Sequence, residues 1–352
     1  MSDITFRVVD TSAIPEELAK AMQPIVLKWE TAALQVAAAH DPQRPQKWPG
    51  GSVEELLDQR FKQFPAITKT RAESKADAVL TSARFSRRAE RLLGVDIRSA
   101  ITTPAVAPTV KFGGDELKRL ADFNDKLAAA AKGARPDGDA GAITWDKLSL
   151  QFIRVACIDE TNGLFGTEKG SDEISIGGAL LDTDGRTNKV SPVDLGGSWD
   201  DGDVRDFKPP KSILGYSMRG GLTFPRNIFI TLLLVERDGN GMQEIINKIV
   251  AKVAEEAKQS LTALLAGAVG AAVGGPVGAL IGLAVGYAVD KIIDKILHLW
   301  DDVAFIPKTI EALIPSRQSM FRGSQTSSSS VVRFRGPGEY ACRYQLQLSE
   351  MT

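Results

Sequence analysis

Acidic side chains lie in the loops beside three segments that have the composition of β-strands. Asp159 follows the first of these segments, Asp172 begins the second, and Glu236 and Asp238 belong to the loop ERDGNG after the third. Carboxylates grouped at strand ends supply hard oxygen ligands, and Ca²⁺ takes about six to eight of them. The pattern therefore makes these loops a candidate Ca²⁺ site. A plain hairpin or helix-entry loop at ERDGNG is the alternative.

This arrangement resembles the calcium- and phospholipid-binding β-sandwich of the synaptotagmins. In that family an aspartate-bearing loop precedes a strand that begins with Ser-Asp, as Ser171-Asp172 does here, and a second acidic loop closes the site. The resemblance implies that the calcium ligands are Asp159, Asp172, Glu236 and Asp238. Two positions depart from the family's pattern, because Glu173 replaces a proline and Glu236 replaces an aspartate.

Residues that commonly carry out catalysis are scarce. The chain has two histidines, and its two cysteines, Cys157 and Cys342, lie in strand-like runs that predict buried free thiols. No HExxH, P-loop or GxSxG motif is present. We therefore expect a protein that is not an enzyme and has no small-molecule substrate. The net charge of −1 and the lack of an aromatic and basic motif argue against nucleic-acid recognition.

The most regular pattern in the chain is a series of glycines at every fourth position. No charged residue occurs from Gln259 to Val289, and within this stretch the spaced glycines are Gly270, Gly274, Gly278, Gly282 and Gly286. Residues four apart share one face of a helix, so the series predicts a groove of bare backbone. Such small-residue faces allow membrane helices to approach each other closely. The stretch is long enough for one membrane span of about 20 residues but not for two.

Pro276 interrupts this stretch, and Gly274-Gly275-Pro276 predicts a turn or a kink. We expect a helical hairpin with arms at about 242–273 and 276–300, an apolar tip and amphipathic outer parts. The segment resembles the glycine-zipper segments of bacterial membrane-associated proteins. In general design it is also similar to the hydrophobic hairpin of pore-forming colicins. The resemblance implies membrane insertion, with the five spaced glycines and Pro276 as the residues that pack helices together.

The remaining elements follow from local patterns. Ser52 and Glu55 predict a capping box at the start of one helix, and Gly94 predicts the end of a helix that begins near residue 69. Further helices are predicted from 15 to 40 and from 115 to 132. Strands are predicted at 4–9, 148–158, 172–182, 187–193, 211–218, 227–236 and 329–349. The expected α+β fold has a helical module at 1–135, an antiparallel β-sandwich at 143–241 plus 329–349, and an inserted glycine-rich hairpin at 242–315.

These patterns together predict a membrane-interacting protein, pore-forming or toxin-like, that deploys its hairpin at a lipid membrane or through self-association. The N-terminus MSDITFRVVD lacks the features of a signal peptide, which indicates synthesis in the cytoplasm and delivery by another route. One alternative is an assembly or interaction protein whose hairpin packs permanently in its own core or in an oligomer interface. A second alternative is a calcium-dependent binding module.

Overall fold

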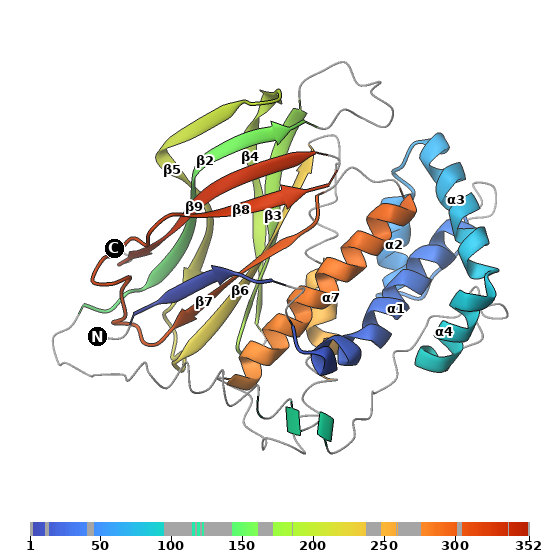
Figure 1. Ribbon diagram of the computed structural model, residues 1–352, viewed down its shortest axis with the longest axis horizontal. Helices are drawn as coiled ribbons and strands as arrows, with labels where there is room; N and C mark the ends of the chain where they lie inside the picture. Colours follow the sequence, from blue (N-terminus) through green and yellow to red (C-terminus); the bar gives the residue numbers. More distant parts are fainter. Residues whose placement is uncertain are drawn as a thin grey trace.

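The fold has three layers, in which two antiparallel sheets form a β-sandwich and helices cover the outer side of one sheet (Figure 1). This confirms the predicted α+β class. The computed structural model describes residues 3–10, 14–40, 46–94, 115, 116, 118, 119, 122, 143–160, 172–184, 186–236, 248–257, 259, 276–300, 305–336 and 338–350.

The sheet next to the helices has five strands in the order β1-β7-β6-β3-β4. Their bounds are Thr5–Val8 for β1, Lys308–Ile314 for β7, Arg226–Glu236 for β6, Asp172–Asp182 for β3 and Thr187–Trp199 for β4. The central strand β6 is covered on both sides. Ile230 and Leu232 belong to the core between the sheets, whereas Phe229 and Leu233 belong to the core beneath the helices. Double burial explains why the sequence of β6 is nearly all apolar.

The second sheet has four strands in the order β5-β2-β9-β8. Their bounds are Val204–Ser217 for β5, Lys147–Asp159 for β2, Glu339–Ser349 for β9 and Ser330–Arg335 for β8. In β9 every second side chain is buried between the sheets, namely Tyr340, Cys342, Tyr344, Leu346 and Leu348. The alternation predicted for this segment is therefore confirmed, and the other side of this sheet carries the exposed residues.

Five labelled helices form the third layer: α1 (Glu16–Ala38), α2 (Val53–Phe61), α3 (Ala66–Leu80), α4 (Ala83–Leu93) and α7 (Pro276–Trp300). Residues 248–257 are also helical. Figure 1 shows α7 between the five-stranded sheet and α1. The helices and the outer side of this sheet share one hydrophobic core, separate from the core between the two sheets.

The local signals for helix ends had mixed outcomes. Ser52 Oγ accepts a hydrogen bond from Glu55 N at 3.0 Å, which confirms the cap, and Gly94 ends α4 with φ +66°. The single helix predicted between about 69 and 93 is wrong. Ser82 starts a new helix there, because its Oγ accepts a hydrogen bond from Phe85 N at 3.2 Å. Most of the helix predicted at 115–132 lies outside the described residues.

The predicted limits of the inserted hairpin also need correction. Lys308–Ile314, placed within the hairpin at 242–315, is strand β7, which pairs with β1 on one side and β6 on the other. The β-strand at 4–9 is confirmed as β1, and it joins this sheet rather than a separate helical module at 1–135. The helices of that module pack against α7 in one core, so the described parts of both segments form a single layer.

Candidate functional site

The glycine face of α7 lies against the five-stranded sheet. A Cβ atom placed on Gly282 would lie 2.0 Å from Cε2 of Phe229 on β6. A Cβ atom placed on Gly286 would lie 3.3 Å from Oγ1 of Thr309 on β7. At these two positions the bare backbone of the helix therefore packs on a sheet of the same chain.

Much of the rest of α7 is buried as well, whereas Lys291, Lys295 and His298 keep part of their side chains exposed. Its side chains with 5% exposure or less are Leu280, Ile281, Leu283, Ala284, Val285, Ala288, Val289, Ile292, Ile293, Ile296 and Trp300. A helix that packs on a sheet with one side and on another helix with the opposite side is expected to be apolar on both sides. The uncharged residues of α7 up to Val289 therefore contribute to the hydrophobic core of this chain.

Helix α1 covers α7 on the side away from the sheet, and ion pairs connect the helices. Lys295 Nζ of α7 lies 3.0 Å from Oε1 of Glu30 on α1, and Arg88 Nη1 of α4 lies 3.2 Å from Oε2 of the same glutamate. Lys28 of α1 also pairs with Glu256 in the helical segment 248–257. The carboxylate of Glu30, whose side chain is 13% exposed, thus connects α1 with both α4 and α7.

The structure describes part of the predicted series of glycines. Gly282 and Gly286 face the sheet, while Pro276 and Gly278 lie in the first turn of α7. Gly270 and Gly274 lie outside the described residues. For the part of the series that is described, the close partner is a sheet of the same chain, as in the alternative of a hairpin that packs in its own core.

The four predicted calcium ligands come from both sheets. Asp172 begins β3 and Glu236 ends β6, and these strand ends are neighbours because Ile174 pairs with Glu236. Asp159 ends β2 in the other sheet, and Asp238 lies outside the described residues. Within the described ranges, no three aspartate, glutamate, histidine or cysteine side chains gather as a metal site. The calcium site stays a prediction.

A buried ion cluster that the sequence analysis did not predict lies where β3, β5 and β6 meet. The fully buried Arg226 places Nη1 2.7 Å from Oδ2 of Asp182 and Nη2 2.5 Å from Oδ2 of Asp184. The hydroxyl of Tyr216 donates to Oδ2 of Asp182 at 3.3 Å, and burial raises the pKa of Tyr216 to about 12. The cluster connects the ends of three strands. No periodic pattern marks it, since its members are far apart in the sequence.

The histidines and cysteines make structural contacts. The ring of His40 packs edge-on against Phe61 with centroids 5.2 Å apart, and His298 Nδ1 lies 2.7 Å from the carbonyl oxygen of Asp294. Cys157 and Cys342 are buried thiols outside any disulfide, as predicted. Burial raises the pKa of the Cys342 thiol, which keeps it protonated.

Comparison with known proteins places a membrane-related feature in this part of the chain. Residues 263–319 match the family model described as the co-chaperone DjlA transmembrane domain. The match includes α7 and β7, and it indicates a membrane-associated role. No curated protein and no solved structure matches the chain. Within the described ranges, no helix combines the length and the apolar character needed to cross a membrane.

Proposed function

We propose that this chain is a membrane-interacting protein that keeps a glycine-rich helical segment against its own sheet until it meets a lipid bilayer. One observation carries the proposal. The region that is similar to a transmembrane domain contains α7, a helix in which eleven of the described apolar side chains are at most 5% exposed in the folded chain. Exposed to water, these side chains would form a large apolar surface, which proteins normally avoid. The proposal includes no catalytic step.

Release of α7 would break specific contacts. The helix would leave Phe229 and Thr309 on the sheet and the carboxylate of Glu30 on α1. A membrane can drive this change only if it binds the released form better than the closed form. The uncharged stretch that precedes Asp290 offers that difference, because lipid can cover it without loss of charge solvation. As a finer proposal, the released segment perforates the bilayer.

A second candidate is an assembly or interaction protein in which α7 never leaves the sheet. The contact of Gly282 with Phe229 favours it, because a fit this close suits a permanent core. The two candidates differ in one respect that an experiment can address, namely whether α7 separates from β7.

An engineered disulfide tests this difference. A Cβ at Gly286 would lie 3.7 Å from Cβ of Thr309, within the range of about 3.5–4.5 Å found in disulfides. In the double variant Gly286→Cys with Thr309→Cys, oxidation would tie α7 to β7. We expect the reduced form to float with vesicles of phosphatidylcholine alone, which the arginine face described below does not bind, and to release an enclosed dye. The oxidised form should do neither, and each single cysteine variant should behave as the wild type in both redox states.

The outcomes separate the candidates. Equal flotation and dye release by the oxidised and reduced forms would overturn release of α7 and leave the permanent core. Flotation of the reduced form without dye release would support membrane insertion and reject perforation. A wild-type protein that binds no vesicle at any pH or calcium concentration would overturn the membrane function itself.

A further inference from the structure

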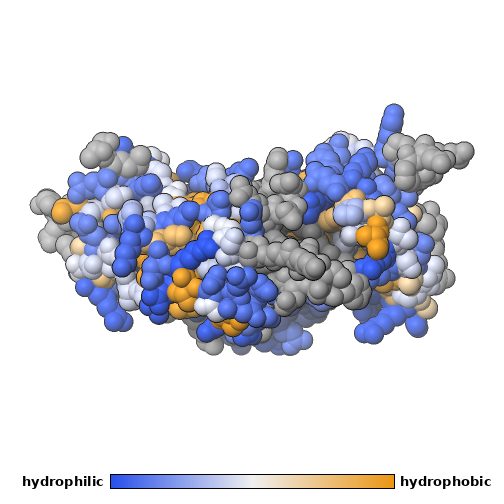
Figure 2. All heavy atoms as spheres, turned by 90° about the horizontal axis from the view of Figure 1, so that it is seen from above, coloured by the Kyte–Doolittle hydropathy of each residue, from blue (hydrophilic) through white to orange (hydrophobic). Residues whose placement is uncertain are grey.

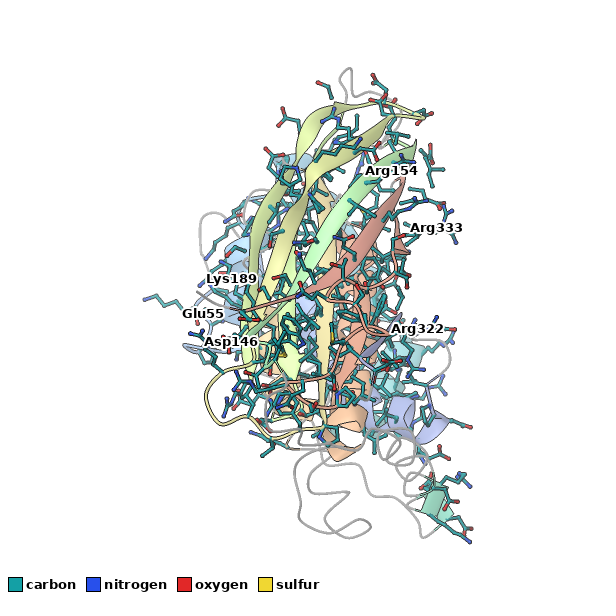
Figure 3. All side chains as sticks on the ribbon, turned by 90° about the vertical axis from the view of Figure 1, so that its left-hand side faces the viewer. Glu55, Asp146, Arg154, Lys189, Arg322 and Arg333 are labelled. Carbon is teal, nitrogen blue, oxygen red and sulfur yellow. The ribbon has the colours of Figure 1, made fainter. Side chains whose placement is uncertain are left out.

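The outer side of the four-stranded sheet carries exposed basic and aliphatic side chains together. We call this surface the arginine face, and its members are Arg154, Lys208, Arg333, Arg335, Arg343, Ile158, Val204 and Val331. The acids on the same strands are Asp159, Asp206 and Glu339. Figure 3 views this sheet directly and shows Arg154 and Arg333 in its upper part.

Two arginines lie directly opposite each other on the central strands of this sheet. Arg154 of β2 is the register partner of Arg343 of β9. Arg154 is neutralised by Asp206, with Nε 2.6 Å from Oδ1 and Nη2 3.0 Å from Oδ2. Among the residues that the structure describes, Arg343 makes no hydrogen bond or ion pair. The carboxylate of Asp206 also attracts Arg343 electrostatically, so two guanidinium groups share this one acid and the pair of strands keeps a net positive charge here.

Arg333 and Arg335 on the edge strand β8 extend the positive charge. Both contact a single carboxylate, with Arg333 Nη1 3.1 Å from Oε1 of Glu339 and Arg335 Nε 3.2 Å from its Oε2. Two guanidinium groups therefore share one negative charge. On the half of the face formed by β8 and β9, the positive charges of these two residues and of Arg343 outnumber the negative charge of Glu339.

The aliphatic members of the face indicate which anion it suits. Among the described residues, five large hydrophobic side chains are exposed, and three of them are on this face: Ile158 (43%), Val204 (54%) and Val331 (43%). Single-stranded nucleic acid is usually bound by exposed aromatic rings that stack on bases, and none of the five is aromatic. Cations interspersed with aliphatic side chains match a bilayer surface, where anionic headgroups border the hydrocarbon region.

We propose that the arginine face is a docking surface for bilayers that contain anionic phospholipid. The face belongs to the sheet on the side of the sandwich away from α7 (Figure 1), so docking requires no release of that helix. The inference shares its membrane partner with the proposed function but uses a different part of the molecule. Each can therefore fail alone.

The test uses the full chain and two kinds of vesicle, phosphatidylcholine alone and phosphatidylcholine mixed with phosphatidylserine. The variant Arg333→Gln with Arg343→Gln removes two charges from the face. Arg84→Gln with Arg91→Gln removes two exposed charges from α4 as the matched control. We expect the face variant to bind mixed vesicles about 30-fold more weakly, from the usual contribution of a basic residue near an anionic surface, and the control to bind as the wild type.

Several outcomes would overturn the docking surface. One is an equal loss in the face variant and the control, and another is binding that ignores phosphatidylserine. Preferential binding to DNA or RNA in place of vesicles is a third. A melting curve for each variant checks that the fold is intact. The variant Val204→Ser with Val331→Ser keeps every charge, and we expect it to weaken binding about 3-fold or more through lost apolar contact. Dye release that needs α7 but not the arginine face would support the proposed function alone.

Discussion

Gly282 of α7 lies over the ring of Phe229 on β6, so closely that an added Cβ would be 2.0 Å from Cε2 of the ring. The ring itself is buried, and the residues around it belong to the core shared by the helices and the five-stranded sheet. One turn further along, a Cβ at Gly286 would meet the hydroxyl of Thr309 at 3.3 Å, a distance that a small shift of that side chain relieves. The two glycines therefore differ in what a methyl group would meet. In agreement with burial of this helix, the hydrophobic atoms visible on the described part of the upper surface form small separate patches (Figure 2).

We expect Gly282→Ala to destabilise the fold and Gly286→Ala to leave it nearly unchanged. Overpacking typically costs about 1–3 kcal/mol, while alanine improves helix propensity by about 1 kcal/mol at either position. The free energy of unfolding in urea, measured for both variants, gives the comparison. Equal values for the two alanine variants would show that α7 does not pack on Phe229 as described.

Removal of the buried guanidinium at Arg226 should cost about 3–5 kcal/mol in the free energy of unfolding. Arg226→Met leaves the carboxylate of Asp182 buried without its cation. A buried charge without a partner costs more free energy than the loss of the whole pair does. The control is Arg219→Met, because Arg219 pairs with Asp146 at the surface, where such a pair contributes about 1 kcal/mol or less. Urea unfolding of both variants should rank them in this order. The reverse order would contradict the role given to the cluster.

Tyr216 should make stability fall in alkaline solution. Burial raises its pKa in the folded chain from 10.0 to about 12, so the folded state holds the phenolic proton where the unfolded state has lost it. The contribution is therefore complete below pH 10 and is lost as the pH rises toward 12. Between these values, the wild type should lose more unfolding free energy than Tyr216→Phe does. Parallel losses in both proteins would show that this phenol does not titrate as the burial implies.

Glu30 should control how firmly α1 holds α7. Glu30→Gln removes the charge that joins Lys295 and Arg88, and we expect a loss of about 1 kcal/mol in unfolding free energy. If α7 is released at membranes, the same variant should release vesicle dye faster than the wild type. A double-mutant cycle that combines Glu30→Gln with Lys295→Gln measures the interaction energy between these two side chains. A destabilised Glu30 variant with unchanged dye release would argue that α1 does not limit release.

The predicted calcium site can be examined by thermal melting. A cation that binds only the folded chain raises the melting temperature, and a chelator should reverse the rise. Asp159→Asn should remove the effect if that side chain is a ligand. An unchanged melting temperature with calcium and with chelator would reject the site and the calcium-dependent module with it.

Much of the fold was predictable because it depends on neighbours in the sequence. The cap at Ser52, the end of α4 at Gly94 and the alternation of β9 each require a few adjacent residues, and all three are confirmed. The strand β7 was missed because its short run follows the helical stretch and differs little from it in composition. It pairs with residues about 80 positions away in β6 and about 300 positions away in β1, and no local pattern indicates such distant partners.

The sequence by itself determined that a helix with a bare glycine face and no charge up to Val289 would form and would need a partner that excludes water. Its spacing is the same whether that partner is another helix, lipid or an aromatic ring. Only the tertiary structure decided that Gly282 meets Phe229, because the partner comes from a strand whose position depends on the whole sheet. It also decided which arginines share the exposed face of the second sheet. The register of β2 and β9 places Arg154 opposite Arg343, although the two residues are far apart in the sequence.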